Sequence, residues 1–442
     1  MIIDNKNILI VGLGKSGKGI YDFAVTKTDN INFYDDKVEE FLGQKVYSKN
    51  TIDEIIEDVD VVVMSPGVPL TVPFIKKYIE AGGNIIGEIE LAYKYCAARV
   101  SAITGTNGKT TTTSLVGDIF KLQNDKTFVL GNIGKSFSSE VKNIEANDNV
   151  ILELSSFQLE TIREFRPFCS AVLNITPDHL NRHITMDKYV EAKENIFKNQ
   201  TASDYIVLNY NDEYCKKMAN KTNAKVVWFS IDKELENGIY YKNNEIIIKY
   251  KNIDAVLCSK KELNIVGEHN IENVMAAAAI ALTNDIKIET IRKAVINFKA
   301  VEHRIEFVRE LEGVKYFNDS KGTNPDASIK AINAMDGGTI LIAGGMDKKN
   351  EFDEFVKSFK DKIKQLNLIG ETKNIIKEEA EKQGFNNIKI FNTFEEAIRG
   401  AYEDSKKNNV KNILLSPGCA SWDMFESYEK RGNIFKDIVA GL

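Results

Sequence analysis

The feature that most constrains the fold is a regular alternation of short β-branched runs with segments of helical periodicity. The runs Asn7–Val11, Val150–Leu154 and Thr339–Ala343 each end at a Gly or a polar residue, and a helical pattern follows. This order is typical of parallel β-sheets covered by helices. We therefore predict an α/β fold rather than an all-β or helical-bundle fold.

The chain is long enough for several such sheets, because 442 residues at about 100–200 residues per domain correspond to two to four domains. The runs form three groups, and a polar segment at 237–251 reads as a β-hairpin added to the second group. We predict three domains, at residues 1–93, 94–300 and 301–442. The predicted strands are Asn7–Val11, Asn30–Tyr34, Asp60–Met64 and Asn84–Ile86, then Val100–Thr104, Val150–Leu154, Ser170–Ile175 and Tyr205–Leu208, and finally Lys315–Asn318, Thr339–Ala343, Asn367–Ile369, Ile388–Phe391 and Asn412–Ser416.

Charge and hydropathy exclude several classes of function. The formal net charge is −6, which gives no overall basic field for nucleic acid or anionic lipid. The longest apolar run, Val274–Leu282, is far shorter than the roughly 20 residues that span a bilayer. No basic segment with a long apolar stretch opens the chain, and the five cysteines lack metal-ligand spacing. We expect a cytoplasmic protein that binds neither nucleic acid nor a membrane.

A glycine-rich loop follows the strand Val100–Thr104 and opens a helix. Backbone N–H groups and the helix dipole at such a loop can surround phosphate, and the lysine and hydroxyl residues suit ATP and Mg²⁺. Ile103 stands where the strict motif has its first glycine, so a glycine turn capped by Thr or Asn is the structural alternative. The predicted ATP-binding residues are Gly105, Thr106, Asn107, Gly108, Lys109, Thr110 and Thr111.

Two polar residues are expected at the same edge of the sheet, because ligands bind beyond the carboxyl ends of parallel strands. Glu153 lies near the end of an apolar run, where a buried strand gains nothing from an unpaired carboxylate. A Mg²⁺ ligand is the interpretation we prefer, and a structural ion pair is the alternative. His179 follows the next strand on a loop, but a lone loop histidine decides little by itself.

A helix is predicted over Asp187–Asn199, and its spacing places Lys193 on the same face as Tyr189, Ile196 and Phe197. A lysine on an apolar face can extend its ammonium to water. It can also be buried until its amine is neutral and open to chemical modification. The sequence leaves both readings open.

A second glycine pattern, Gly12-Leu13-Gly14-Lys15-Ser16-Gly17, follows the first strand, and Asp35 and Asp36 end the next one. Alone, this Rossmann-like fingerprint predicts an NAD-dependent oxidoreductase. That hypothesis gives no role to the phosphate loop, to Glu153 or to the third domain. A nucleotide-driven switch is a further alternative, and it would hydrolyse ATP without any acceptor amino acid.

With these residues identified, the whole chain resembles the Mur ligases. The motifs that carry the resemblance are TGTNGKTTT from Thr104, GNIG from Gly131, LELSSFQLE from Leu152, NITPDHLNRH from Asn174, YVEAKENIF from Tyr189, GEHNIEN from Gly267, HR at His303, NDSKGTN from Asn318 and SPGCASWDMF from Ser416. The resemblance implies a Rossmann-like first domain, a central mononucleotide-binding domain and a Rossmann-like third domain.

It also implies an activity. An ATP-dependent ligase of peptidoglycan precursor synthesis would add D-glutamate to UDP-N-acetylmuramoyl-L-alanine through an acyl phosphate, as a monomer. The segment around Lys348 is a loose match, Gly418 replaces a more usual alanine, and Asn324-Pro325 resembles the wider family. A sister ligase for another amino acid is therefore the alternative.

The resemblance assigns roles to single residues. Lys109, Glu153, His179 and Lys193 would be catalytic. Thr110, Glu153, His179 and a carbamylated Lys193 would hold two Mg²⁺ ions, and Asn270, Arg304 and Asp319 would complete the ATP site. Asn270 could instead be a helix N-cap. The UDP substrate would contact Gly14, Lys15, Ser16, Gly17, Asp35, Asp36, Ser65, Pro66, Gly67, Asn132 and His179. The amino acid would contact Lys321, Thr323, Lys348, Ser421 and Tyr428, and its two carboxylates would suit the two lysines.

Overall fold

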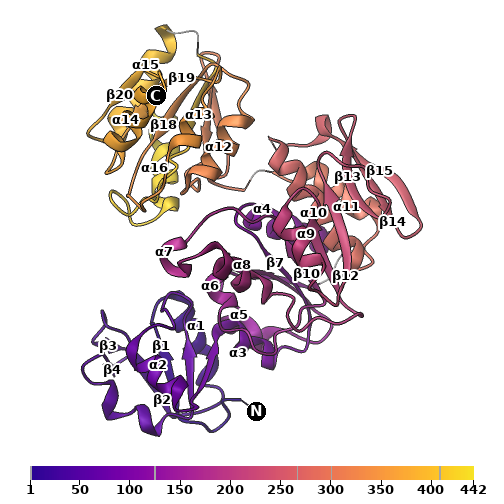
Figure 1. Cartoon of the computed structure of the whole chain (residues 1–442), viewed down its shortest axis with the longest axis vertical. Coiled ribbons are helices and arrows are strands. Elements are labelled where there is room, and N and C mark those ends of the chain that lie inside the picture. The colour runs from indigo at the N-terminus through magenta and orange to yellow at the C-terminus, as the bar shows by residue number, and fades with distance from the viewer. Residues whose placement is uncertain (1, 124–125, 266, 300, 408–409) are drawn as a thin grey trace. The chain divides into compact units, whose positions relative to one another are not determined.

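The computed structural model describes residues 2–123, 126–265, 267–299, 301–407 and 410–442. It contains three sheets, each built largely from parallel strands with helices on its faces, which confirms the predicted α/β class (Figure 1). The chain divides into two compact units. Unit 1 comprises Met1–Lys261 and Glu272–Ile296, and unit 2 comprises Glu262–Ile271 and Asn297–Leu442. The predicted domain boundary at residue 300 lies outside the described residues.

The first sheet has the strand order β3-β4-β2-β1-β5-β6. Its middle strands are β-branched and buried on both sides, as parallel strands require. Helices α1 and α3 cover one face and α2 covers the other. The elements are β1 (Ile8–Val11), α1 (Lys15–Ala24), β2 (Ile31–Tyr34), β3 (Glu40–Phe41), β4 (Gln44–Tyr47), β5 (Val61–Met64), α2 (Pro73–Glu80), β6 (Asn84–Gly87) and α3 (Glu88–Tyr95), with short 3₁₀ turns at Ile52–Glu54 and Ile56–Asp58.

The second sheet has nine strands in the order β15-β14-β13-β12-β11-β10-β7-β9-β8. Strands β7 to β12 are parallel to their neighbours, whereas β13, β14 and β15 are joined as antiparallel pairs. The predicted hairpin is confirmed, and β15 extends it. The strands are β7 (Arg99–Thr104), β8 (Thr127–Gly131), β9 (Asn149–Glu153), β10 (Cys169–Val172), β11 (Tyr205–Asn209), β12 (Lys225–Ser230), β13 (Gly238–Lys242), β14 (Glu245–Tyr250) and β15 (Ile253–Ser259).

One continuous apolar core joins the first two sheets within unit 1, since side chains of β1, α3, β9 and α8 belong to the same buried cluster. The Ala-rich run Val274–Leu282 is buried throughout. The helices of this region are α4 (Lys109–Leu122), α5 (Phe137–Glu140), α6 (Ser156–Leu159), α7 (Leu180–His183), α8 (Met186–Glu194), α9 (Glu213–Ala219), α10 (Glu268–Thr283) and α11 (Ile288–Asn297), with 3₁₀ turns at Val141–Asn143 and Lys260–Glu262.

The third sheet has the order β16-β17-β21-β18-β19-β20, and only β16 is antiparallel to its neighbour among the described strands. Helices α12, α13 and α14 cover one face, and α15 and α16 cover the other. The elements are β16 (Glu306–Leu311), β17 (Val314–Asn318), α12 (Pro325–Ala334), β18 (Thr339–Ala343), α13 (Asp353–Lys357), β19 (Ile363–Leu368), α14 (Lys373–Lys382), β20 (Ile388–Ile390), α15 (Phe394–Lys407), β21 (Asn412–Leu415) and α16 (Tyr428–Ala440).

Two predicted helix details are wrong. The helix predicted over Asp187–Asn199 ends at Glu194, because the following amides bond to carbonyls three residues back: Ile196 N to Lys193 O at 3.1 Å and Phe197 N to Glu194 O at 3.1 Å. Asn270 is not a helix N-cap, because α10 already begins at Glu268.

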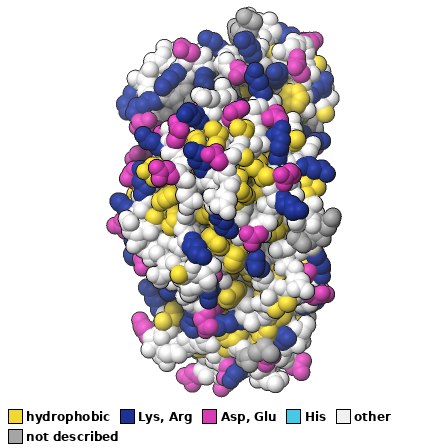
Figure 2. All heavy atoms as spheres, turned by 90° about the vertical axis from the view of Figure 1, so that its right-hand side faces the viewer, with side chains coloured by type: hydrophobic (Ala, Val, Ile, Leu, Met, Phe, Trp, Pro, Cys, Tyr) yellow, Lys and Arg dark blue, Asp and Glu magenta, His cyan; other side chains and the backbone are white. Residues whose placement is uncertain are grey.

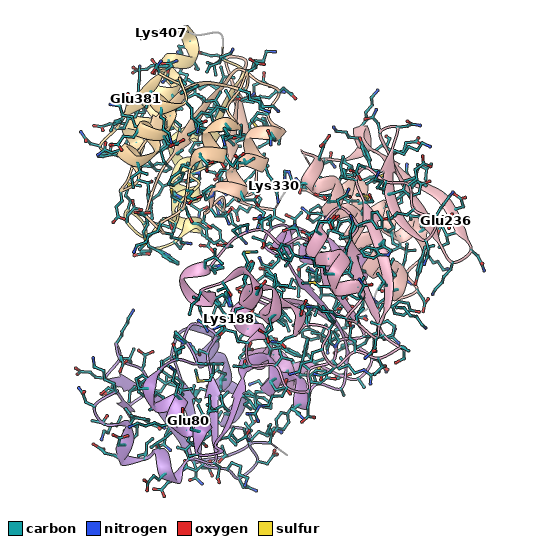
Figure 3. The ribbon with its side chains drawn as sticks, viewed as in Figure 1. Glu80, Lys188, Glu236, Lys330, Glu381 and Lys407 are labelled. Carbon is teal, nitrogen blue, oxygen red and sulfur yellow. The ribbon has the colours of Figure 1, made fainter. Side chains whose placement is uncertain are left out.

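The distribution of charged side chains on the surface agrees with the modest net charge of the chain. Lys/Arg and Asp/Glu side chains are interspersed over the face drawn in Figure 2. Glu80, Glu236 and Glu381 project from the surface, as Figure 3 shows. Among the described residues, no helix is both long and apolar enough to cross a membrane.

Candidate active site

The phosphate loop connects β7 to α4 and has the backbone that its glycines predict. Gly105 and Gly108 have φ values of +148° and +84°, which L side chains rarely adopt. A Cβ on Gly108 would also lie 2.2 Å from Asn273 Oδ1. Asn174, shortly after the neighbouring strand β10, holds the loop, because its Oδ1 accepts from Asn107 N at 2.9 Å and its carbonyl accepts from Thr106 N at 2.9 Å. The loop is therefore fixed on two sides.

Two lysines converge on one carbonyl of this loop. Lys109 Nζ donates to Gly105 O at 2.9 Å and to Thr106 O at 2.8 Å. Lys193 Nζ approaches from α8 and donates to the same Gly105 O at 2.8 Å, with Thr104 Oγ1 at 3.3 Å. Both amines therefore lie at the loop where an anionic ligand would bind.

Lys193 is 1% exposed, so the reading in which its ammonium reaches water is wrong. Its Nζ lies 4.8 Å from the centre of the Tyr189 ring. Burial, and then the charge of Lys109, lower the pKa of Lys193 well below its ordinary value, although Asp178 and Glu153 oppose this. The lowered pKa favours the neutral, nucleophilic form of the Lys193 amine.

Glu153 ends β9 and is 1% exposed. Its Oε1 accepts from Asn132 Nδ2 at 2.7 Å, whereas its Oε2 is buried and has no hydrogen-bond partner among the described residues. The Glu153 carbonyl accepts from Asn132 N at 2.8 Å. Within the described parts of the chain, Glu153 forms no ion pair, so the structural alternative gains no support. A buried, half-satisfied carboxylate is destabilising unless a ligand completes it.

His179 lies at the start of α7 in a left-handed conformation, with φ of +54°. Its side chain is 40% exposed, and its Nε2 lies 3.6 Å from Asp178 Oδ2. The ring packs edge to face on Phe157, with centroids 4.8 Å apart. The histidine is therefore oriented by its neighbours and still accessible.

The strand order explains why these residues can act together. Strands β10, β7, β9 and β8 are adjacent and parallel. Each is followed at its carboxyl end by one part of the candidate site: His179 after β10, the phosphate loop after β7, Glu153 at the end of β9, and Asn132 after β8. The predicted clustering at one sheet edge thus follows from topology.

The donor set fits Mg²⁺ in part. Buried Thr110 is next to Lys109, and Glu153 offers an unpartnered carboxylate oxygen. No group of three His, Cys, Asp or Glu residues that could hold a metal occurs in the described ranges. Mg²⁺ commonly takes only one or two carboxylates and completes its shell with phosphate and water, so these residues suit a nucleotide-bound ion.

The glycine pattern of the first sheet also forms a closely packed turn. A Cβ on Gly17 would lie 2.0 Å from Gly12 O. Asp35 Oδ2 accepts from Leu13 N at 3.0 Å, and Ser65 Oγ donates to Gly12 O at 2.6 Å. Asp35 and Ser65, both predicted substrate contacts, therefore brace the turn. Lys15 Nζ donates to the carbonyl of Gly134, which links this turn to the segment that carries Asn132.

Asp36 and Ser16 are two further predicted substrate residues in the domain of the first sheet. Asp36 accepts from Lys49 N at 2.9 Å and from Tyr34 Oη at 3.1 Å. Gly14 is the N-cap of α1, so Ser16 lies in the first helical turn. Contacts of Gly14, Ser16, Asp36, Pro66 and Gly67 with a UDP group stay predictions.

In unit 2, the predicted amino-acid residues follow three adjacent strands, in the order β17-β21-β18. Lys321 and Thr323 come after β17, Ser421 after β21, and Lys348 after β18. Both lysines lie over aromatic rings: Lys321 Nζ is 5.2 Å from the Tyr428 ring centre, and Lys348 Nζ is 5.4 Å from that of Trp422. Such cation–π contacts help to hold an ammonium group in place.

Asp319 is an acidic residue of unit 2 whose pKa is raised. Ser416 Oγ donates to its Oδ2 at 2.7 Å. Burial raises the pKa of Asp319 to about 7, against the lowering effects of the Ser416 hydrogen bond and of Arg304. Arg304, Asp319 and Asn270 belong to unit 2, and their contribution to an ATP site stays a prediction.

Two arginines that sequence reasoning missed are prominent in the structure. Arg431 is fully buried in α16 and donates to backbone carbonyls, including Ser320 O at 2.7 Å and Cys419 O at 3.2 Å. Arg182 contacts the loop after β5. Arg431 lies in a stretch that reads as a charged helix face, so no signal marked it. Arg182 lies one turn after His179 in the same motif, and that proximity was the available signal.

Comparison with known proteins places the whole chain. Residues 6–87 match the MurD-like N-terminal domain of Mur ligases, residues 103–281 the Mur ligase middle domain, and residues 303–419 the Mur ligase glutamate ligase domain. The UDP-N-acetylmuramoylalanine--D-glutamate ligase of Clostridioides difficile (strain 630) is 48% identical, with 100% of both chains covered. The enzyme of that name from Lachnoclostridium phytofermentans is 46% identical, with 99% of this chain and 98% of that protein covered.

Solved structures agree on the fold. The UDP-N-acetylmuramate-alanine ligase MurC from Thermotoga maritima superposes with a TM-score of 0.63 at 17% identity and covers 99% of both chains. MurF from Acinetobacter baumannii gives a TM-score of 0.63 at 15% identity, over 93% of this chain and 91% of that one. At these identities the likeness establishes the three-sheet architecture alone.

Proposed function

The chain belongs to the Mur ligase family, and we propose that it joins D-glutamate to UDP-N-acetylmuramoyl-L-alanine with conversion of ATP to ADP and phosphate. It is an ATP-dependent ligase that acts on small molecules. The observation that carries the proposal is the convergence of Lys109 and Lys193 on Gly105 O, at the same sheet edge as the half-satisfied Glu153. A lysine at a phosphate-binding loop is typical of phosphoryl transfer, and this supports the proposal.

The first step brings like charges together. A carboxylate oxygen of the UDP substrate attacks the γ-phosphorus of ATP, the bond from phosphorus to the β,γ-bridging oxygen breaks, and ADP leaves. One pair of unit charges at 4 Å costs about 4 kcal/mol at an effective dielectric of 20. Lys109, fixed at the loop, offsets this repulsion, and the loop amides orient the phosphates for in-line attack.

The second step forms the amide. The neutral amine of D-glutamate attacks the carbonyl carbon of the acyl phosphate, the nitrogen loses one proton to solvent, and the C–O bond breaks as phosphate leaves the tetrahedral intermediate. Because water would hydrolyse the acyl phosphate, solvent must be excluded while the amine attacks. We assign the glutamate to Lys321, Thr323, Lys348, Ser421 and Tyr428, where two lysines can pair with the two carboxylates.

Mg²⁺ belongs to this proposal as well. Thr110 and Glu153 would hold one ion, and His179 with a carbamylated Lys193 a second. Mg²⁺, when bound, neutralises phosphate oxygens. A lysine amine adds to CO₂ in its neutral form, which yields a carbamate and releases one proton, and the lowered pKa of Lys193 favours that form. We assign Asn270, Arg304 and Asp319 to the nucleotide.

The remaining assignments concern the UDP substrate and the chain as a whole. We assign UDP to the first-sheet turn, and the substrate carboxylate to the edge near Asn132 and His179. We further propose domains at residues 1–93, 94–300 and 301–442, a monomeric state, and a role in cytoplasmic peptidoglycan precursor synthesis. The UDP-binding residues are Gly14, Lys15, Ser16, Gly17, Asp35, Asp36, Ser65, Pro66, Gly67, Asn132 and His179.

The test is phosphate release from ATP with UDP-N-acetylmuramoyl-L-alanine and a panel of D- and L-amino acids. We expect release and product only with D-glutamate, and neither in the Lys109→Ala variant. A preference for L-alanine, meso-diaminopimelate or L-lysine would indicate a sister activity. Phosphate release that needs no amino acid would contradict the ligase assignment.

A further inference from the structure

Arg182 connects the two sheets of unit 1 at the candidate site. It lies in α7, and its guanidinium reaches the loop that follows β5 of the first sheet. Arg182 NH1 donates to Pro66 O at 2.8 Å, with Gly67 O at 3.4 Å, and its NH2 lies 3.4 Å from Val68 O. The loop it contacts contains Pro66 and Gly67, two of the residues that we assign to the UDP substrate.

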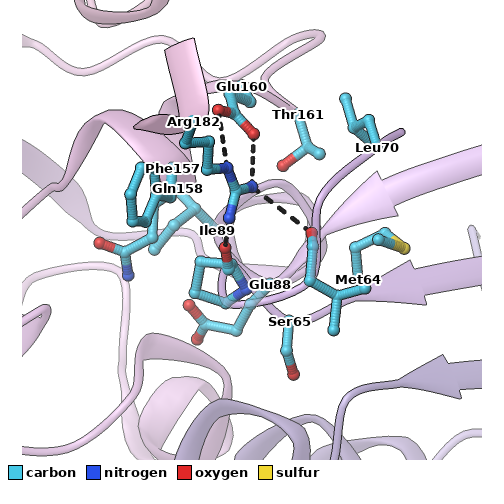
Figure 4. Close-up of a pocket in the computed structure, with 12 residues that line it drawn as sticks. Met64, Ser65, Leu70, Glu88, Ile89, Phe157, Gln158, Glu160, Thr161 and Arg182 are labelled. Carbon is cyan, nitrogen blue, oxygen red and sulfur yellow. Dashed lines mark hydrogen bonds and ion pairs between the residues drawn. The ribbon is translucent and has the colours of Figure 1, made fainter. Parts of the chain in front are cut away.

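The other side of the guanidinium is fixed by Glu160. Arg182 Nε lies 3.2 Å from Glu160 Oε1 and its NH2 lies 2.6 Å from Oε2, a two-point pair that Figure 4 shows. The side chains are 13% and 17% exposed, so water screens the pair less than at an open surface. A planar fork held at two points cannot rotate freely, which fixes the donors that face the loop.

The same arginine is coupled to the phosphate-loop edge. Arg182 N donates to His179 O at 3.0 Å, so both residues share one helical turn. The Phe157 ring contacts both side chains, with the Arg182 guanidinium 4.2 Å from its centre and the His179 ring 4.8 Å away. Movement of Arg182 would therefore also shift His179, both through the backbone and through the Phe157 ring.

We propose that Arg182 is a positioning residue: it holds the substrate loop of the first sheet at a set distance from His179 and the phosphate loop of the second. This inference rests on the proposed function. A substrate anchored on the first sheet must present its carboxylate to a phosphoryl group bound on the second. An error of about 1 Å in such a reacting pair can lower the rate about 100-fold.

Variants of Arg182 and Glu160 test the contribution of each side chain separately. Arg182→Gln removes the fork, and Arg182→Lys keeps a charge that can reach either Glu160 or Pro66 O but not both through fixed donors. Glu160→Gln weakens the pair that orients the Arg182 guanidinium, while Arg182 keeps its bond to Pro66 O. Arg163→Gln is the matched control. Arg163 NH1 also links the second sheet to the first, by donating to Asn84 Oδ1 at 2.8 Å, but it is exposed and has no contact with these loops among the described residues.

Steady-state kinetics and ATP binding by calorimetry are measured on the full-length chain. For Arg182→Gln we expect kcat/KM for the UDP substrate to fall about 100-fold. We expect ATP affinity within about 3-fold of wild type, because the phosphate loop is untouched. Arg182→Lys and Glu160→Gln should show intermediate losses, and Arg163→Gln should match wild type. A purely structural role would lower ATP affinity in parallel with kcat/KM.

Two outcomes would overturn the proposal: an Arg182→Gln variant as active as wild type, or parallel losses of kcat/KM and ATP affinity. If Arg182→Gln does not fold, Glu160→Gln decides, and wild-type kcat/KM in that variant overturns the proposal. A wild-type chain without ligase activity would instead refute the proposed function, so the two failures are distinguishable.

Discussion

Replacing Glu153 by Gln should separate stability from activity. In the wild type, Glu153 Oε2 is a buried oxygen with no hydrogen-bond partner among the described residues, while Oε1 accepts from Asn132. An unsatisfied buried polar group costs about 1–3 kcal/mol, and more when it is charged. Gln keeps the shape and the bond to Asn132, and it replaces an unpartnered charged oxygen by an unpartnered neutral NH2 group, which costs less to bury. We therefore expect the free energy of unfolding to rise by about 1 kcal/mol.

A rise of this size corresponds to an unfolding temperature about 2–4 °C higher for a domain of 150–250 residues. Ligase activity should fall at least ~100-fold, as expected when an electrostatic group of an active site is lost. The assays are scanning fluorimetry and phosphate release. Fluorimetry with ATP and Mg²⁺ should also show a smaller ligand-dependent rise in the variant than in the wild type.

The matched control is Glu145→Gln. The Glu145 side chain is 82% exposed and lies 3.8 Å from Lys126 Nζ, so its loss should change the free energy of unfolding by less than ~0.5 kcal/mol and leave activity intact. A Glu153→Gln variant that is less stable than wild type but fully active would refute the reasoning. It would mean that the carboxylate serves the fold rather than a ligand.

Three further predictions concern buried ionisable groups. Lys193→Ala should lower kcat about 100- to 1000-fold, with KM for the UDP substrate nearly unchanged in steady-state kinetics. Burial raises the pKa of Asp319 to about 7, so the folded state binds this proton more tightly than the unfolded state does. The unfolding temperature should therefore fall as pH rises from about 4 to about 7, and Asp319→Asn should flatten that slope. Arg431→Met should destabilise unit 2 by about 2–4 kcal/mol in thermal unfolding, since the carbonyls of Ser320 and Cys419 lose their donor, and KM for D-glutamate should rise. Unchanged values in any of these assays would contradict the corresponding role.

The sequence predicted the buried parallel strands well, because their apolar runs are short, β-branched and bounded by glycine or polar residues. It missed strands that lie at sheet edges or carry polar residues. Strand β16 has no buried residue, β3 has two residues, and β15 alternates half-buried and exposed positions over its first four residues. Such strands depend on pairing with a neighbour rather than on their own hydrophobicity, so a single sequence carries little signal for them.

The site was predictable where local spacing decides the outcome. The phosphate loop follows from strand, glycines and helix in order, and spacing places Lys193 beside Tyr189 on one helix face. Whether that face buries the amine or lets it reach water was left open by the sequence. The sharing of Gly105 O by Lys109 and Lys193 was not predictable, because it depends on how α8 packs on the loop. Arg182 and Arg431 were missed because charged residues are ordinarily exposed and their partners are backbone carbonyls distant in sequence.

The central claim is that the substrate carboxylate is activated as an acyl phosphate at the loop 105–108. UDP-N-acetylmuramoyl-L-alanine labelled with oxygen-18 in both carboxylate oxygens tests it directly, by mass spectrometry of the phosphate released with ATP and D-glutamate. Attack of the carboxylate on the γ-phosphorus transfers one labelled oxygen to each phosphate and leaves the other in the amide. Amide product accompanied by unlabelled phosphate would contradict the account.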